Sequence, residues 1–153
     1  MELVFKYIHS VWAILVLVAV IAATINALRG ALGEQRPYLP KDFKLALSAL
    51  ILTHLQFVIG LVLYFLSGKI LWFSGISASE IMKNSELRLY NVEHPTVMLI
   101  AIAFLTIGYS KHKKKRTSQQ KLKTLAIFYS IALLCMLSRV PWSQWLGTWS
   151  DLF

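Results

Sequence analysis

Four long apolar blocks are the feature that most constrains this 153-residue chain. They cover approximately residues 5–28, 45–66, 92–109 and 124–140, and each is close to the ~20 residues that a helix needs to cross a bilayer. Backbone groups inside lipid must hydrogen-bond within their own segment, so such blocks predict helices. The sequence therefore predicts an all-α membrane protein, with one domain over residues 1–153 built as a four-transmembrane-helix bundle.

Composition supports this class and excludes others. The chain is 57% hydrophobic and only 15% charged, whereas a soluble domain is nearer half apolar and a quarter charged. A soluble enzyme, a disordered chain and a nucleic-acid-binding module are excluded, although the net charge of +9 would suggest nucleic acid in a soluble protein. We expect no nucleic-acid partner.

The basic residues predict the topology. Of the 16 Lys and Arg residues, four lie in the connection 29–44 and seven in the connection 110–123. Short basic connections stay in the cytoplasm, which places both termini outside, on the periplasmic side. The lysine cluster at 111–115 is a topology signal in this interpretation, and a contact with anionic lipid headgroups is the alternative.

The segments on the outer side carry aromatic and amphipathic patterns. The connection 67–91 predicts either a short amphipathic helix on the membrane surface or an ordered lid over the bundle. Trp142, Trp145 and Trp149 follow the fourth block and resemble an aromatic belt at the interface. The only cysteine, Cys135, lies inside an apolar block, where a packing role is expected.

Two histidines lie at matched depth on different predicted helices. His9 is close to the outer start of the first block, and His94 is close to the outer start of the third. At ~1.5 Å per residue, both lie within about 6 Å of the outer boundary. Two neutral imidazoles that face each other across a bundle suit the axial positions of a haem iron. The alternatives are an interfacial ring for His9 and a polar helix start at His94, with Pro95 in the first turn.

The surroundings of this pair fit the same hypothesis. An apolar slot is expected from Trp12 and Met98, and small residues would let the macrocycle approach the helices (Ala13, Gly60 and Ala101). Arg139, at the outer end of the fourth block, is the expected partner of the haem propionates, with Arg88 as a weaker candidate. Glu93 is expected to orient a neighbouring ring or face water, with a ligand role as the alternative.

The other two histidines receive different predictions. His54 lies roughly 18 Å below the outer surface, too deep to meet His9 or His94. It is expected to hydrogen-bond Tyr129 or Ser130 between helices, and the alternatives are a quinone contact or a second haem ligand. His112 lies in a basic connection and is expected to be solvated.

Three stretches resemble one four-helix half of the haem A synthase family: residues 7–13 around His9, residues 54–60 with a Leu-Gln…Gly pattern, and the helix that begins at His94. The chain also resembles small bacterial four-helix membrane proteins labelled cytochrome b. The resemblance implies that His9 and His94 ligate one haem, assigns no ligand role to His54, and implies a bacterial cytoplasmic membrane. Lys6 and Ser10 stand where the synthase family has Glu and Arg, and the chain matches one half of the family's eight helices. Full synthase activity is therefore not implied.

Three functions follow as hypotheses. The first is a membrane cytochrome that binds haem b without covalent attachment, since no Cys-x-x-Cys-His run occurs. It would transfer electrons near the outer face, between quinol and a redox partner or within a larger respiratory complex. The second is a cofactor-free accessory or assembly subunit of a larger membrane complex. The third, an enzyme acting on haem or quinone through Glu93 or His54, ranks lowest.

Overall fold

The computed structural model describes residues 1–33, 36–72, 74–143 and 145. Its elements are α1 (Glu2–Leu32), α2 (Pro40–Leu66), α3 (Ala78–Lys83), α4 (Ser85–Arg88), the π-helical turn η1 (Leu89–Glu93), α5 (His94–Lys113) and α6 (Ser118–Arg139). Four helical stretches are long and apolar enough to cross a membrane: Glu2–Leu32, Pro40–Leu66, Ser85–Lys113 and Ser118–Arg139. The prediction of an all-helical membrane protein with four spans is confirmed, and the side on which the termini lie stays a prediction.

At several ends the helices continue beyond the apolar blocks into polar sequence. α2 starts at Pro40, whose ring suits a first helical turn, and the Asp42 carboxylate accepts the Leu39 N–H at 2.7 Å. α6 starts at Ser118, where the Thr117 hydroxyl accepts the Gln120 N–H. Lys, Arg and Gln are good helix formers. Hydropathy therefore marks the part of each helix suited to lipid, while the helix itself is longer.

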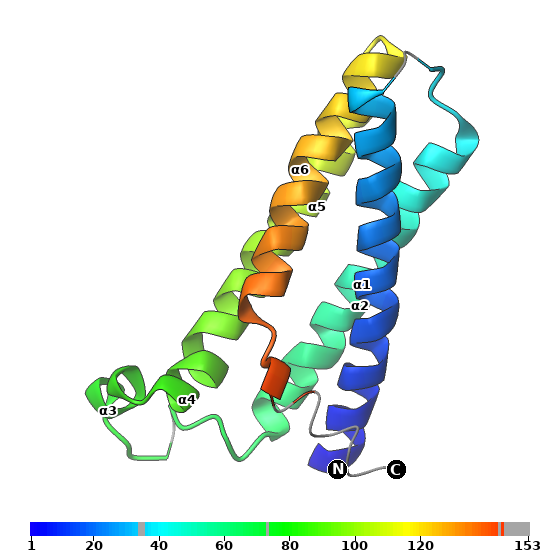
Figure 1. Ribbon diagram of the computed structural model, residues 1–153. Coiled ribbons are helices and arrows are strands. Elements are labelled where there is room, and N and C mark those ends of the chain that lie inside the picture. The colour runs from blue at the N-terminus through cyan, green and yellow to red at the C-terminus, as the bar shows by residue number, and fades with distance from the viewer. Residues whose placement is uncertain (34–35, 73, 144, 146–153) are drawn as a thin grey trace.

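The four long helices run up and down in an antiparallel bundle (Figure 1). α1 packs against α2 and α6, and α5 packs against α6, whereas α2 and α5 touch over a smaller region. We call the end with connections 33–39 and 114–117 the basic end. The opposite end, with residue 1, the connection 67–84 and residues 140–143, is the histidine end. There α3 and α4 project sideways from the bundle (Figure 1).

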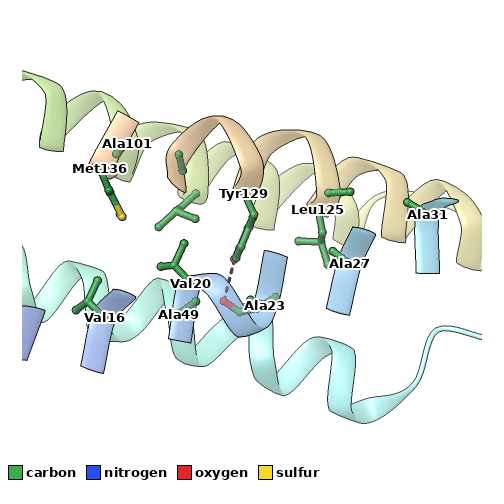
Figure 2. Packing of buried hydrophobic residues seen from close by; sticks show 14 residues of the cluster. Val16, Val20, Ala23, Ala27, Ala31, Ala49, Ala101, Leu125, Tyr129 and Met136 are labelled. Carbon is green, nitrogen blue, oxygen red and sulfur yellow. Dashed lines mark hydrogen bonds between the residues drawn. The ribbon is translucent and has the colours of Figure 1, made fainter. Parts of the chain in front are cut away.

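Small side chains let the helices approach closely in the buried core. Figure 2 shows Ala23 and Ala27 of α1 close to the larger Tyr129 and Leu125 of α6. In membranes, such small residues increase van der Waals contact between helices. Tyr129 is fully buried and donates its hydroxyl to the Ala46 carbonyl at 2.8 Å, the dashed line in Figure 2. This bond joins α6 to α2 through the centre of the bundle.

The buried core lies mainly in the middle of the bundle and at the basic end. The apolar buried cluster begins at Val16 in α1 and ends at Met136 in α6. In α2, Thr53 is the last buried residue, and residues 54–66 are all at least partly exposed. The histidine-end half of α2 therefore contributes no fully buried residue to the core.

One buried asparagine organises the connection at the histidine end. The Asn91 side chain accepts the Leu71 N–H at 2.9 Å and donates to the carbonyls of Lys69 and Leu87. Asn91 lies in the π-helical turn directly before His94, and π-turns frequently occur at functional sites. The predicted amphipathic segment contains the short helices α3 and α4, with Ile81 buried and Met82 exposed.

Candidate functional site

His9 of α1 and His94 of α5 meet at the histidine end. Their ring centres are 6.3 Å apart and the ring planes make an angle of 73°. Both residues are partly buried. The expected matched depth of the two rings is thus present in the structure, and the pair defines the candidate site.

The proton position on His94 is fixed by the backbone. Its Nδ1 lies 2.8 Å from the carbonyl oxygen of Arg139. A carbonyl oxygen only accepts, so Nδ1 carries the proton and donates, and Nε2 has a free lone pair. Metal-binding histidines are commonly oriented in this way, with the second ring nitrogen bonded to a carbonyl or carboxylate. Arg139 therefore contributes through its backbone, a role that sequence analysis missed.

α2 supplies the surface against which His9 lies. The Gln56 Nε2 donates to the His9 carbonyl at 2.9 Å and lies 3.2 Å from the ring Nδ1. One turn further along α2, Gly60 leaves room for the ring, since a Cβ there would be 2.9 Å from His9 Cε1. Sequence analysis noted both residues but did not identify Gln56 as a site residue. The four-residue spacing, which places Gln56 and Gly60 on one face of a helix, was the available signal.

Trp12 and Met98 lie between the histidine pair and the core. Trp12 is partly buried, packs on the core cluster and donates its Nε1–H to the Leu52 carbonyl at 3.1 Å. Met98 is likewise partly buried against the core. Both belong to the helices that carry the histidines, one turn further along each, and they give the site an apolar border.

A cluster of charged groups lies beside the site at the histidine end. Glu93 pairs with Arg88 at 2.7 Å and with Arg139 at 3.3 Å, and all three side chains are partly exposed. Two guanidinium groups thus share one carboxylate next to His94, leaving a net positive charge. Guanidinium groups in such positions bind carboxylates through paired hydrogen bonds.

The structure corrects the predictions for His54 and His112. His54 is exposed and its Nδ1 donates to the Leu50 carbonyl at 2.8 Å, so the predicted bond to Tyr129 or Ser130 is wrong. The reason is rotational: His54 lies on the outward face of α2, and Tyr129 binds Ala46 instead. His112 is 1% exposed rather than solvated, because α5 continues past residue 109 and turns this ring toward Tyr38, whose hydroxyl lies 3.0 Å from Nε2.

Two of the three tryptophans after α6 lie within the described residues, and their role as an aromatic belt stays a prediction. Trp142 is exposed, its ring centre is 5.6 Å from that of Trp145, and the Trp145 Nε1–H donates to the Ser10 carbonyl at 3.3 Å. Trp149 lies outside the described residues.

The candidate site offers two ring nitrogens as its main ligands. Within residues 1–33, 36–72, 74–143 and 145, no three His, Cys, Asp or Glu residues are grouped to hold a metal ion. A pair of imidazoles suits a metal that brings other ligands with it, as the iron of a porphyrin does.

Comparisons with protein-family models, curated proteins and solved structures find no match to this chain. The fold and the site thus define a class only: a four-helix membrane protein with a histidine pair near one end. The resemblance to haem A synthase and to small cytochrome b proteins stays a prediction.

Proposed function

We propose that this protein is a membrane cytochrome that binds one haem b between His9 and His94. The observation that carries the proposal is the 6.3 Å separation of the two ring centres. An imidazole nitrogen binds a metal at about 2 Å. At the observed separation, His9 and His94 could therefore both hold one haem iron through a ring nitrogen.

The chemistry of the surrounding residues supports the same proposal. The His94 Nε2 carries a lone pair, because Nδ1 donates to the Arg139 carbonyl. Gly60 removes a side chain where His9 needs room, and Trp12 and Met98 give an apolar border. No residue of α2 beyond Thr53 is fully buried, which is consistent with a bulky apolar group covering part of this end.

Arg139 and Arg88 are the proposed partners of the haem propionates. Both already bind a carboxylate, that of Glu93, so their guanidinium groups are arranged for this chemistry. Propionates would then compete with Glu93 for the two arginines.

A bound haem supplies one-electron transfer, and the protein's own residues hold and orient it and exclude water from its apolar edge. We place the histidine end on the periplasmic side of a bacterial cytoplasmic membrane, because the basic connections lie at the other end. Electrons would enter from a quinol or another donor and pass to a redox partner, within a larger respiratory complex. The exposed apolar faces of the helices would contact the membrane lipid.

An optical experiment tests the proposal. The protein is purified in detergent with haem supplementation, and a reduced-minus-oxidised spectrum is recorded beside a haemin titration of the apoprotein. We expect the spectrum of a six-coordinate bis-imidazole haem, lost in His9→Leu and in His94→Leu and kept in the matched control His54→Leu. A wild-type preparation without a Soret band would refute the proposal, and so would an unchanged spectrum in both ligand variants.

A further inference from the structure

Gln56 contacts both the backbone and the ring of His9. Its Nε2 is 2.9 Å from the His9 carbonyl oxygen and 3.2 Å from the His9 Nδ1. An amide nitrogen only donates, so in this arrangement Nδ1 accepts and the ring proton of neutral His9 lies on Nε2. His94 is arranged in the opposite way, because its Nδ1 donates to a carbonyl.

The other atom of the Gln56 amide is buried. Within the part of the chain that the structure describes, the Gln56 Oε1 makes no hydrogen bond. An orphaned buried atom beside a candidate site calls for an explanation. A half-turn of the amide would direct Oε1 at Nδ1, where it could accept a proton from the ring. The half-turn would also break the Nε2–H bond to the His9 carbonyl, so the second orientation requires a ligand on the His9 Nε2 to offset that loss.

We propose that Gln56 is a positioning residue whose amide orientation selects the tautomer of His9. With Nε2 of Gln56 facing the ring, His9 carries its proton on Nε2. With Oε1 facing the ring, Nδ1–H donates to the amide and the His9 Nε2 lone pair is free to bind a metal. One proton leaves Nε2 and one is gained at Nδ1, so the ring stays neutral. The link to a metal ligand rests on the proposed function, whereas the control of the tautomer does not.

The rings of His9 and His94 would then be held in different ways. His94 is held permanently by a backbone carbonyl, and His9 is held by a side chain that can turn. The hydrogen bond at the second ring nitrogen sets the basicity of a metal-binding imidazole. Gln56 would therefore influence both the affinity for haem and the relative stability of its ferric and ferrous forms.

Three variants separate this role from a general structural one. Gln56→Glu offers only acceptors when ionised, Gln56→Met keeps the length of the side chain without a hydrogen-bonding group, and Gln119→Met is the matched control. Gln119 also donates its Nε2 to a carbonyl, that of Ala31 at 2.8 Å, and its buried Oε1 likewise has no partner among the residues that the structure describes. It lies at the basic end, away from the histidine pair.

The first measurement uses the apoprotein. Nitrogen-15 chemical shifts of the His9 imidazole report which nitrogen carries the proton. We expect the Nε2–H tautomer in the wild type and in Gln119→Met, the Nδ1–H tautomer in Gln56→Glu, and a mixture in Gln56→Met. The same tautomer in all four proteins would overturn the proposal.

The second measurement uses the haem-loaded protein. For Gln56→Met we expect haemin affinity to fall roughly 10–100-fold, the usual effect of removing such a partner. For Gln56→Glu we expect the ferric-to-ferrous affinity ratio to rise about tenfold, which lowers the midpoint potential by about 59 mV for one electron. The proposal would also be overturned if the two Gln56 variants had the same midpoint potential and haemin affinity as Gln119→Met. A wild type that binds no haem would refute the proposed function alone, since the apoprotein shifts still decide whether Gln56 selects the tautomer.

Discussion

The two ends of the bundle use buried polar groups in different ways. At the basic end, the Asp42 carboxylate is fully buried and accepts hydrogen bonds from Arg36, Asn26 and the Leu39 N–H, at 2.6–2.8 Å. At the histidine end, two imidazoles meet edge-on, and the Gln56 Oε1 beside them has no donor among the described residues.

This difference separates structural polar groups from candidate binding groups. A buried charge that is paired and hydrogen-bonded on every side holds helices and connections together. Two imidazole rings that lie close together without a hydrogen bond between them in the described structure suit a ligand that is not part of the chain. We therefore expect substitutions at the basic end to change stability, and substitutions at the histidine end to change haem binding.

The largest stability effect is expected for Asp42→Ala. It leaves the Arg36 guanidinium and the Asn26 amide without their shared acceptor, and removing one partner of a buried pair destabilises by about 3 kcal/mol or more. The free energy of unfolding can be measured by denaturant titration in detergent. The control Glu86→Ala breaks an exposed pair with Lys69 and should lower stability by less than ~1 kcal/mol. Equal losses in the two variants would contradict the structural role of Asp42.

Two glycine-to-alanine variants test the comparison directly. In α5, a Cβ at residue 108 would collide with the Cβ of Phe128 in α6, and we expect Gly108→Ala to destabilise the fold by about 2 kcal/mol. In α2, Gly60→Ala meets only the His9 ring and should leave stability within ~0.5 kcal/mol. Haemin affinity should fall roughly tenfold in Gly60→Ala and should change less in Gly108→Ala. Unchanged haemin binding in Gly60→Ala would place the haem elsewhere.

A smaller effect is expected for Tyr38→Phe, which removes the hydroxyl beside His112. The loss of this hydrogen bond should lower the free energy of unfolding by about 1 kcal/mol. Burial raises the pKa of Tyr38 to about 12, while the unfolded side chain titrates near pH 10. The hydroxyl therefore contributes stability that is present below about pH 10 and is lost as the pH rises toward 12.

The pH dependence gives a second measurement on the same variant. Between about pH 10 and 12, the free energy of unfolding of Tyr38→Phe should fall less than that of the wild type. Parallel curves for the two proteins would show that Tyr38 does not titrate differently in the folded state.

Sequence predicted the bundle because a bilayer demands long apolar helices, and it predicted the meeting of His9 and His94 because depth follows from residue spacing. It did not predict which way each residue faces around a helix axis. Helix rotation is set by packing of all four helices, and long apolar blocks show little amphipathic pattern that would reveal it. This is why His54 was expected to point inward and was found exposed, and why the contact between Gln56 and His9 was not foreseen.

The smallest effect is expected for His54→Leu. The ring is exposed on α2 and donates Nδ1–H only to the carbonyl of the preceding turn, at Leu50, so its removal breaks no contact between helices. We expect the free energy of unfolding to stay within ~0.5 kcal/mol of the wild type and the haem spectrum to stay unchanged. Dithionite and a short-chain quinol should both be tried as reductants of the haem-loaded variant. If dithionite still reduced the haem but the quinol did not, His54 would belong to the site that receives electrons from quinol. Function would then not be confined to the histidine end.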